Sequence, residues 1–231
     1  MLKRGNSVTD MCDSETVMDA IHPRFLEKPI IVLRGLKIAL VQLPVGADKT
    51  KNVAAAVKEI QLAKERGAQL VALPECFNSP YGTKFFEQYA EEVPSGETSR
   101  ALSRAAAECG VCVVGGTVPE RCGGRLYNTC TVWDASGKLL AQHRKVHLFD
   151  IDIPGKMTFK ESEVLSAGDQ VTTFEYCGVK IGVGICYDLR FYEMAHVMAN
   201  KDLETVAEVR SQIPIRSQRR TDIYDTITKD K

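Results

Sequence analysis

The chain contains 231 residues, in which 30 Lys and Arg balance 30 Asp and Glu, and hydrophobic residues make up 44% of the total. This length suits one domain with a core of normal size, and a neutral chain without a basic run is a poor candidate for binding nucleic acid. The apolar runs are too short to cross a bilayer, and the first residues lack the apolar stretch of a secretory signal. We therefore expect a cytoplasmic protein, with the mitochondrion as the alternative, whose eight cysteines are reduced thiols.

The domain is expected to begin with a strand, a helix and a second strand. Residues 1–34 are interpreted as a poorly ordered leader and residues 35–231 as the domain itself. The apolar run 36–43 predicts a buried strand. Asp48 offers an N-cap for the helix that follows, and the apolar run 68–74 predicts a second buried strand. This order indicates a layered α/β fold.

The rest of the chain mixes helices with antiparallel hairpins, which indicates a mixed sheet. In chain order the predicted elements are a short helix at 84–92, a helix at 98–109, a strand at 111–118, a hairpin of 125–134 with 138–146, a hairpin of 171–176 with 179–186, and a helix at 189–200. The second hairpin ends at Cys186, directly before the last helix.

Cys186 is the candidate nucleophile because it stands at a sharp turn from a strand into a helix. Such a turn exposes the side chain, and the next amide, that of Tyr187, can point at a developing oxyanion. The thiol needs a base to become a thiolate, and no histidine stands in an obviously catalytic context. Glu75 and Lys145, however, each follow a strand. If the three side chains converge, Glu75 takes the thiol proton and Lys145 stabilises a tetrahedral intermediate.

Each of these residues also has an ordinary structural interpretation. A cysteine after an apolar strand is more often an inert buried thiol, and a Glu or Lys at a strand end is usually a solvated charge. Taken singly, each interpretation as a catalytic group is the weaker one. Only the joint pattern of the three residues favours a catalytic site.

Two further motifs are interpreted as structural. Cys109 and Cys112 have the spacing of a redox motif, but a helix ends there and a strand begins, which is the reverse of the usual order. A thiol redox protein is therefore a weaker hypothesis than packing, and no second ligand pair supports a zinc site. Gly182 and Gly184 lie within the strand before Cys186, where they are expected to let the backbone approach a neighbour closely.

Three sequence blocks together resemble the nitrilase, or carbon–nitrogen hydrolase, superfamily. They are LVALPECF around Glu75, HRKVHLFDIDIPGKMTFKES around Lys145, and GVGICYDLRF around Cys186. The resemblance runs from about Leu36 to Asn200 and resumes in the tail. It implies a catalytic triad of Glu75, Lys145 and Cys186, with Glu161 as a second glutamate that orients the site and the substrate amide.

The resemblance also implies a fold and an activity. The family fold is an αββα sandwich whose subunits commonly pair as homodimers. The block HLFDIDIPGK with FKES is most similar to the omega-amidase branch. Members of that branch hydrolyse the terminal amide of short dicarboxylate monoamides such as alpha-ketoglutaramate and alpha-ketosuccinamate, through a cysteine acyl-enzyme and without a metal or organic cofactor.

An omega-amidase must also hold the distal carboxylate of its small-molecule substrate, most simply with a cation. Arg190 and Lys156 are candidates by position. Arg190 has an equally good interpretation as a structural partner of a nearby carboxylate.

The chain departs from the family pattern after the helix that follows the nucleophile. Residues 201–231 resemble the family tail, which normally comes after further strands and helices. The sequence therefore predicts an internal deletion between about Met198 and Asp202, and a sandwich that is incomplete in its C-terminal part. The alternative hypothesis is a catalytically impaired form that acts, if at all, by pairing with full-length subunits.

Overall fold

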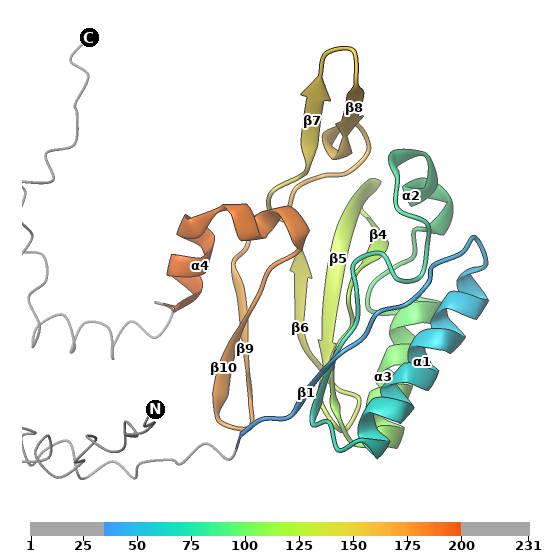
Figure 1. The fold of residues 1–231 in the computed structure, drawn as a ribbon, viewed down its shortest axis with the longest axis vertical. Helices are drawn as coiled ribbons and strands as arrows, with labels where there is room; N and C mark the ends of the chain where they lie inside the picture. The colour runs from blue at the N-terminus through green and yellow to red at the C-terminus, as the bar shows by residue number, and fades with distance from the viewer. Residues whose placement is uncertain (1–34, 200–231) are drawn as a thin grey trace, which may run out of the picture. The chain divides into compact units, whose positions relative to one another are not determined.

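A computed structural model of the chain describes residues 35–199. Its strands are β1 (Ile38–Leu40), β2 (Leu70–Ala72), β3 (Cys112–Val114), β4 (Val118–Cys122), β5 (Arg125–Trp133), β6 (Leu139–Arg144), β7 (Asp150–Ile153), β8 (Met157–Lys160), β9 (Thr172–Tyr176) and β10 (Val179–Val183). Its helices are α1 (Lys49–Glu65), α2 (Thr83–Tyr89), α3 (Glu97–Cys109) and α4 (Tyr192–Ala199), with short 3-10 helices η3 (Glu161–Glu163) and η4 (Cys186–Arg190). Figure 1 shows these elements in chain order.

A six-stranded mixed sheet forms the centre of the described part. Strands β1, β2 and β3 are parallel neighbours, and β3 pairs antiparallel with β5. Thr129 of β5 faces Val118 of β4 on one edge and Arg144 of β6 on the other. Strand β5 therefore joins the parallel strands β1, β2 and β3 to the antiparallel strands β4 and β6.

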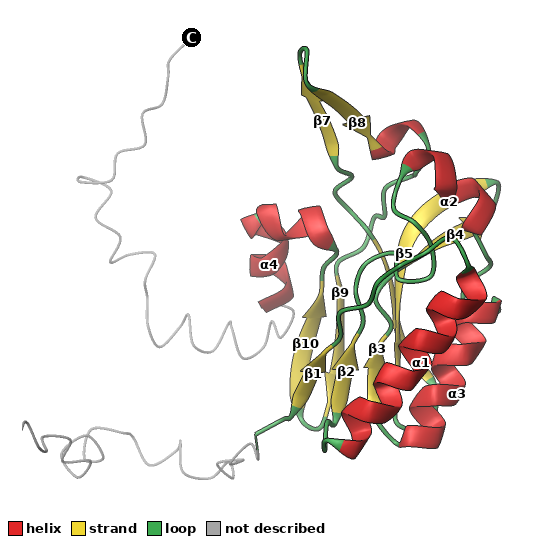
Figure 2. Cartoon of the chain, turned by 45° about the vertical axis from the view of Figure 1, so that its right-hand side comes forward, coloured by secondary structure: helices red, strands yellow, loops and turns green. Residues whose placement is uncertain are grey.

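Helices α1 and α3 cover one face of this sheet, as Figure 2 shows. The carboxylate of Asp48 accepts a hydrogen bond from the Lys51 N–H at 3.1 Å, which confirms the predicted N-cap of α1. Ile60 of α1 and Leu102 of α3 are buried against Val71 of β2 in one core cluster. Because side chains alternate along a strand, the neighbouring Leu70 belongs to a second cluster.

The β9–β10 hairpin covers the opposite face of the sheet. Phe174 and Val183 pack in the second cluster with Leu70 and Val132. Gly182, next to Val183 on β10, approaches α4 so closely that an added Cβ would lie 2.6 Å from the Met198 sulfur. The order is therefore helix, strand, strand, helix, as the resemblance implies, and the predicted close approach at Gly182 is confirmed.

The structure differs from the predicted elements in three places. Strand β1 forms but is not buried, since it lies at the edge of the sheet, where Leu40 is 81% exposed. The strand expected at 111–118 is two strands, because the chain turns at Gly115 and Gly116 between β3 and β4. The β7–β8 hairpin was not predicted, because its exposed DIDI and MTFK segments lack a continuous apolar run.

Some expectations fall outside the described residues. They are the leader at 1–34, the tail at 201–231, and all but the start of the segment where the deletion is predicted. Among residues 35–199, no helix is long and apolar enough to cross a membrane.

Candidate active site

Glu75 follows β2 at a point where the backbone is tightly held. The Cys76 N–H donates to Thr117 Oγ1 at 2.8 Å, and Cys76 itself has a φ of 50°. Gly116, with a φ of 54°, lies against Pro74 so closely that an added Cβ would stand 2.1 Å from the Pro74 carbonyl oxygen. A left-handed conformation at a residue other than glycine is often associated with a functional site. The β3–β4 turn thus fixes where the Glu75 side chain begins.

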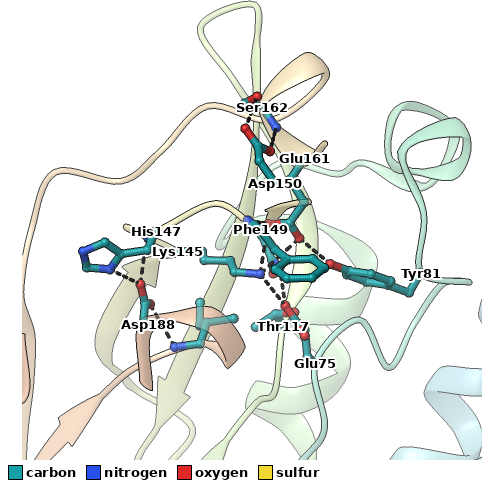
Figure 3. A network of polar contacts seen from close by, with 12 residues as sticks. Glu75, Tyr81, Thr117, Lys145, His147, Phe149, Asp150, Glu161, Ser162 and Asp188 are labelled. Carbon is teal, nitrogen blue, oxygen red and sulfur yellow. Dashed lines mark hydrogen bonds and ion pairs between the residues drawn. The ribbon is translucent and has the colours of Figure 1, made fainter. Parts of the chain in front are cut away.

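Lys145 follows β6, and its side chain is completely buried between two carboxylates. Its backbone N–H donates to the Asn128 carbonyl oxygen at 2.8 Å, which continues the pairing of β6 with β5. Its Nζ lies 3.2 Å from Glu75 Oε1 and 3.0 Å from Glu161 Oε2. Figure 3 shows the ammonium group between the two acids.

Glu161 begins η3 and is also completely buried. Tyr81 donates its hydroxyl to Glu161 Oε1 at 2.6 Å, and the Phe149 N–H donates to Oε2 at 2.7 Å. With Lys145, each oxygen of Glu161 therefore has a donor, which satisfies a buried carboxylate. The sequence did not single out Tyr81, because nothing local to it marks a partner 80 positions away.

The electrostatics of this cluster keep Lys145 charged. Burial alone would lower the pKa of Lys145, but the charge of Glu75 and the hydrogen bond and charge of Glu161 outweigh burial and raise it. The cluster therefore presents a fixed positive charge beside Glu75.

Cys186 lies where β10 passes into η4, with a φ of 47° that marks the sharp turn expected from the sequence. It lines the same pocket as Glu75, between the end of the central sheet and the β9–β10 hairpin. Burial, followed by the charge of Glu75, raises the pKa of the Cys186 thiol. The resting residue is therefore a protonated thiol that needs a base when it attacks.

The family model described as Carbon-nitrogen hydrolase matches residues 37–225. The chain belongs to the carbon–nitrogen hydrolase family. It is 54% identical over 165 residues to Omega-amidase NIT2-B of Xenopus laevis, covering 71% of this chain and 59% of that protein. It is 49% identical over 169 residues to Omega-amidase NIT2 of Homo sapiens, covering 73% and 61%. The chain thus spans less than two thirds of the length of these relatives.

Solved structures show the same carbon–nitrogen hydrolase fold. Nit3 from Saccharomyces cerevisiae, a member of branch 10 of the nitrilase superfamily, has a TM-score of 0.64 at 41% identity, covering 72% of this chain and 60% of that one. A mutant of the amidase from Nesterenkonia sp. AN1, with the acetamide moiety of fluoroacetamide covalently added at the active-site cysteine, has a TM-score of 0.58 at 26% identity, covering 68% of this chain and 58% of that one. The predicted α/β fold of the nitrilase type is confirmed.

Asp188 is a residue of the candidate site that the sequence did not single out. Its carboxylate accepts from the Ile185 N–H at 3.0 Å, from the His147 N–H at 2.8 Å, and lies 2.8 Å from His147 Nδ1. His143 Nε2 lies 3.4 Å away. Two of the histidines that lacked an evident role thus contact the segment that carries Cys186, as Figure 3 shows for His147.

Tyr187 supplies its ring to an aromatic cluster and its amide to the start of η4. The ring stands edge-on to Phe149 and Phe191, with centroids 5.2 and 5.3 Å apart. The first bond within the 3-10 helix runs from the Asp188 N–H to the Ile185 carbonyl. The Tyr187 N–H lies before it and has no partner within the helix, as is usual for the first turn.

Lys145, Glu75 and Glu161 form one acid–lysine cluster. The two candidate cations are not part of it. Arg190 ends η4 with an exposed side chain, and Lys156 is exposed at the turn of the β7–β8 hairpin. Neither makes an ion pair with Glu75, Glu161 or any other residue of 35–199. Glu75 is the only charged side chain on the wall of the pocket that it shares with Cys186, as far as residues 35–199 define it.

The Cys109 and Cys112 pair has the surroundings of packed thiols. Cys112 is fully buried, and burial raises its pKa to about 12. Burial also raises the pKa of Cys109. Neither thiol is therefore activated as a redox motif requires. Within residues 35–199, no group of three or more His, Cys, Asp or Glu is arranged to hold a metal ion.

Proposed function

We propose that this chain is an amidase that hydrolyses the terminal amide of a short dicarboxylate monoamide, such as alpha-ketoglutaramate or alpha-ketosuccinamate, and releases ammonia. The observation that carries the proposal is the convergence of Glu75, Lys145 and Glu161 beside the pocket that Cys186 lines. The substrate class rests on the omega-amidases to which the chain is similar. A covalent adduct on the active-site cysteine of the related amidase supports cysteine chemistry.

In the proposed reaction, the Cys186 sulfur forms a bond to the amide carbon while its proton passes to Glu75. The tetrahedral oxyanion is stabilised by the Lys145 ammonium and the Tyr187 N–H. The C–N bond then breaks, and Glu75 returns the proton to the nitrogen, which leaves as ammonia. Water, deprotonated by Glu75, attacks the thioester, and the free acid and the thiol are regenerated.

The proposal also assigns a role to Glu161 and a partner to the distal carboxylate of the substrate. Glu161 is held by Tyr81, Phe149 and Lys145, so in the proposal it orients the lysine and contributes an oxygen to the substrate amide group. The distal carboxylate calls for a cation. Arg190, four positions after Cys186, remains the first candidate and Lys156 the second.

The proposal is tested by ammonia release from alpha-ketoglutaramate with the purified chain and with Cys186→Ala. We expect turnover by the unsubstituted chain and a loss of at least about 1000-fold in the variant, because the acyl-enzyme cannot form. A folded chain with a cooperative melt that releases no ammonia would refute the proposal and favour the form that acts only by pairing with full-length subunits.

Assembly and compartment are part of the proposal. We expect a homodimer, on the family resemblance, and a location in the cytoplasm with the mitochondrion as the alternative. Sedimentation of the purified chain and imaging of a tagged one decide these two points.

A further inference from the structure

Asn128 connects the two halves of the acid–lysine cluster from inside the sheet. It lies on β5, is 2% exposed, and is opposite Pro119 of β4. Its backbone carbonyl accepts from the Lys145 N–H at 2.8 Å. Its side-chain Nδ2 donates to Glu75 Oε1, also at 2.8 Å. One residue therefore holds both the backbone of Lys145 and the carboxylate of Glu75.

The hydrogen bond from Asn128 makes the two oxygens of Glu75 different. A carboxylate oxygen only accepts, so the amide nitrogen must face it. Oε1 already receives Lys145 Nζ at 3.2 Å. With the Asn128 bond, Oε1 has two donors, whereas Oε2 accepts no hydrogen bond from residues 35–199. Glu75 and Cys186 line the same pocket, and burial, followed by the charge of Glu75, raises the pKa of the Cys186 thiol.

The rest of the Asn128 side chain gives no structural reason for an amide here. Its Oδ1 is buried and has no hydrogen-bond partner among residues 35–199. An unsatisfied buried carbonyl costs about 1–3 kcal/mol, and asparagine is disfavoured in strands. An apolar residue of the same size would avoid both costs, so what the amide provides is its bond to Glu75.

We propose that Asn128 is a positioning residue that holds Glu75 Oε1 against Lys145, so that Oε2 is the oxygen that exchanges the proton with Cys186. This inference rests on the proposed amidase function. The proton from the Cys186 sulfur goes to Oε2 as the bond from sulfur to carbon forms, and the same oxygen delivers it to the leaving nitrogen. Asn128 neither touches the substrate nor gains or loses a proton.

The test compares kcat and KM for alpha-ketoglutaramate in Asn128→Leu and Asn128→Asp at pH 8. We expect kcat to fall about 10- to 100-fold in Asn128→Leu, since a misplaced base loses part of its usual effect, with KM within about twofold. Asn128→Asp keeps the volume but replaces the donor with a like charge beside Oε1. Its kcat should fall at least as far, and full kcat in this variant would overturn the inference.

The matched control is Thr131→Val on the same strand. Thr131 is also buried, and this variant removes one hydrogen bond, from Trp133 Nε1 at 2.9 Å, outside the site. It should melt at a lower temperature and keep its kcat. If Asn128→Leu behaves in the same way, Asn128 is merely structural and the inference fails.

Crystal structures of the unsubstituted chain and of Asn128→Leu separate this inference from the proposed function. If the unsubstituted chain releases no ammonia, the amidase proposal fails, and the position of Glu75 still decides the role of Asn128. Glu75 Oε1 displaced from Lys145 Nζ in the variant supports the positioning role. An unmoved carboxylate contradicts it.

Discussion

The Asp188 carboxylate fastens the turn that carries Cys186 to the segment that follows Lys145. Burial would raise the pKa of Asp188, but hydrogen bonds from His143 and from the backbone of Ile185 and His147 outweigh burial and lower it to about 2. Because His147 is two residues from Lys145, these bonds tie the proposed nucleophile to the fixed cation.

This lowered pKa predicts how stability depends on pH. The ordinary value is 3.8, so the stabilisation by Asp188 is complete above about pH 4 and is lost as the pH falls toward 2. At pH 7, Asp188→Asn should lower the free energy of unfolding by about 2 kcal/mol. The difference from the unsubstituted chain should shrink on acidification, as measured by urea unfolding at a series of pH values.

The control for this prediction is Asp134→Asn in the β5–β6 turn. Asp134 accepts from Ser136 and Lys138 within its own turn, so its loss should cost less and leave the position of Cys186 unchanged. A penalty for Asp188→Asn that is the same at pH 3 and pH 7 would show that its charge is not the stabilising property.

The sequence predicted the residues of the site whose local context is distinctive, and it missed their partners. Glu75, Lys145, Glu161 and Cys186 each lie in a block that resembles the family, and the structure brings the first three into contact. The partners act over long separations: Asn128 bonds to Glu75 across 53 positions, Tyr81 to Glu161 across 80, and His147 to Asp188 across 41. Only the tertiary fold brings these distant segments of the chain together.

At the scale of elements, the turn between β3 and β4 determines where β2 delivers Glu75. Gly116→Ala places a Cβ against the Pro74 carbonyl, and the backbone before Glu75 must shift. We expect a loss of about 1 kcal/mol from the positive φ and about 1–3 kcal/mol more from the clash, with a lower kcat. Urea unfolding and ammonia release measure the two effects.

The matched control is Gly124→Ala in the next turn, between β4 and β5. Gly124 has a φ of 74° but nothing within 4 Å of an added Cβ, so only the cost of the positive φ remains. Equal losses of stability in the two variants, with equal kcat, would mean that the approach of Gly116 to Pro74 does not position Glu75.

Elements with a local signal were predicted, and elements defined by their surroundings were not. Helix α1 has an N-cap at Asp48, and the β9–β10 hairpin has a turn at Gly178, so both are encoded nearby. The Gly115-Gly116 pair within 111–118 is a local turn signal, but the close packing of Gly116 on Pro74 that accompanies the break is not encoded nearby. The exposure of β1 depends on which strands flank it.

At the scale of the whole molecule, the chain covers 59% of the length of Omega-amidase NIT2-B, and the described part shows an apolar sheet edge. Strand β1 pairs with β2 alone among the described strands. Its Ile38 is 52% and its Leu40 81% exposed. An edge strand with unpaired backbone groups and apolar side chains is a template for pairing with another chain.

This edge predicts concentration-dependent association beyond the proposed dimer. Leu40→Lys should raise the concentration needed for larger species by about tenfold or more, because a buried leucine contributes about 1.5–3 kcal/mol and each 1.4 kcal/mol is a factor of ten. Light scattering after size exclusion, over a range of loading concentrations, measures the shift. Met157→Lys on the β7–β8 hairpin, where Met157 is 50% exposed, adds the same charge away from β1. If it suppresses association equally, net charge rather than the β1 edge controls assembly, whereas an effect confined to Leu40→Lys assigns the association to that strand.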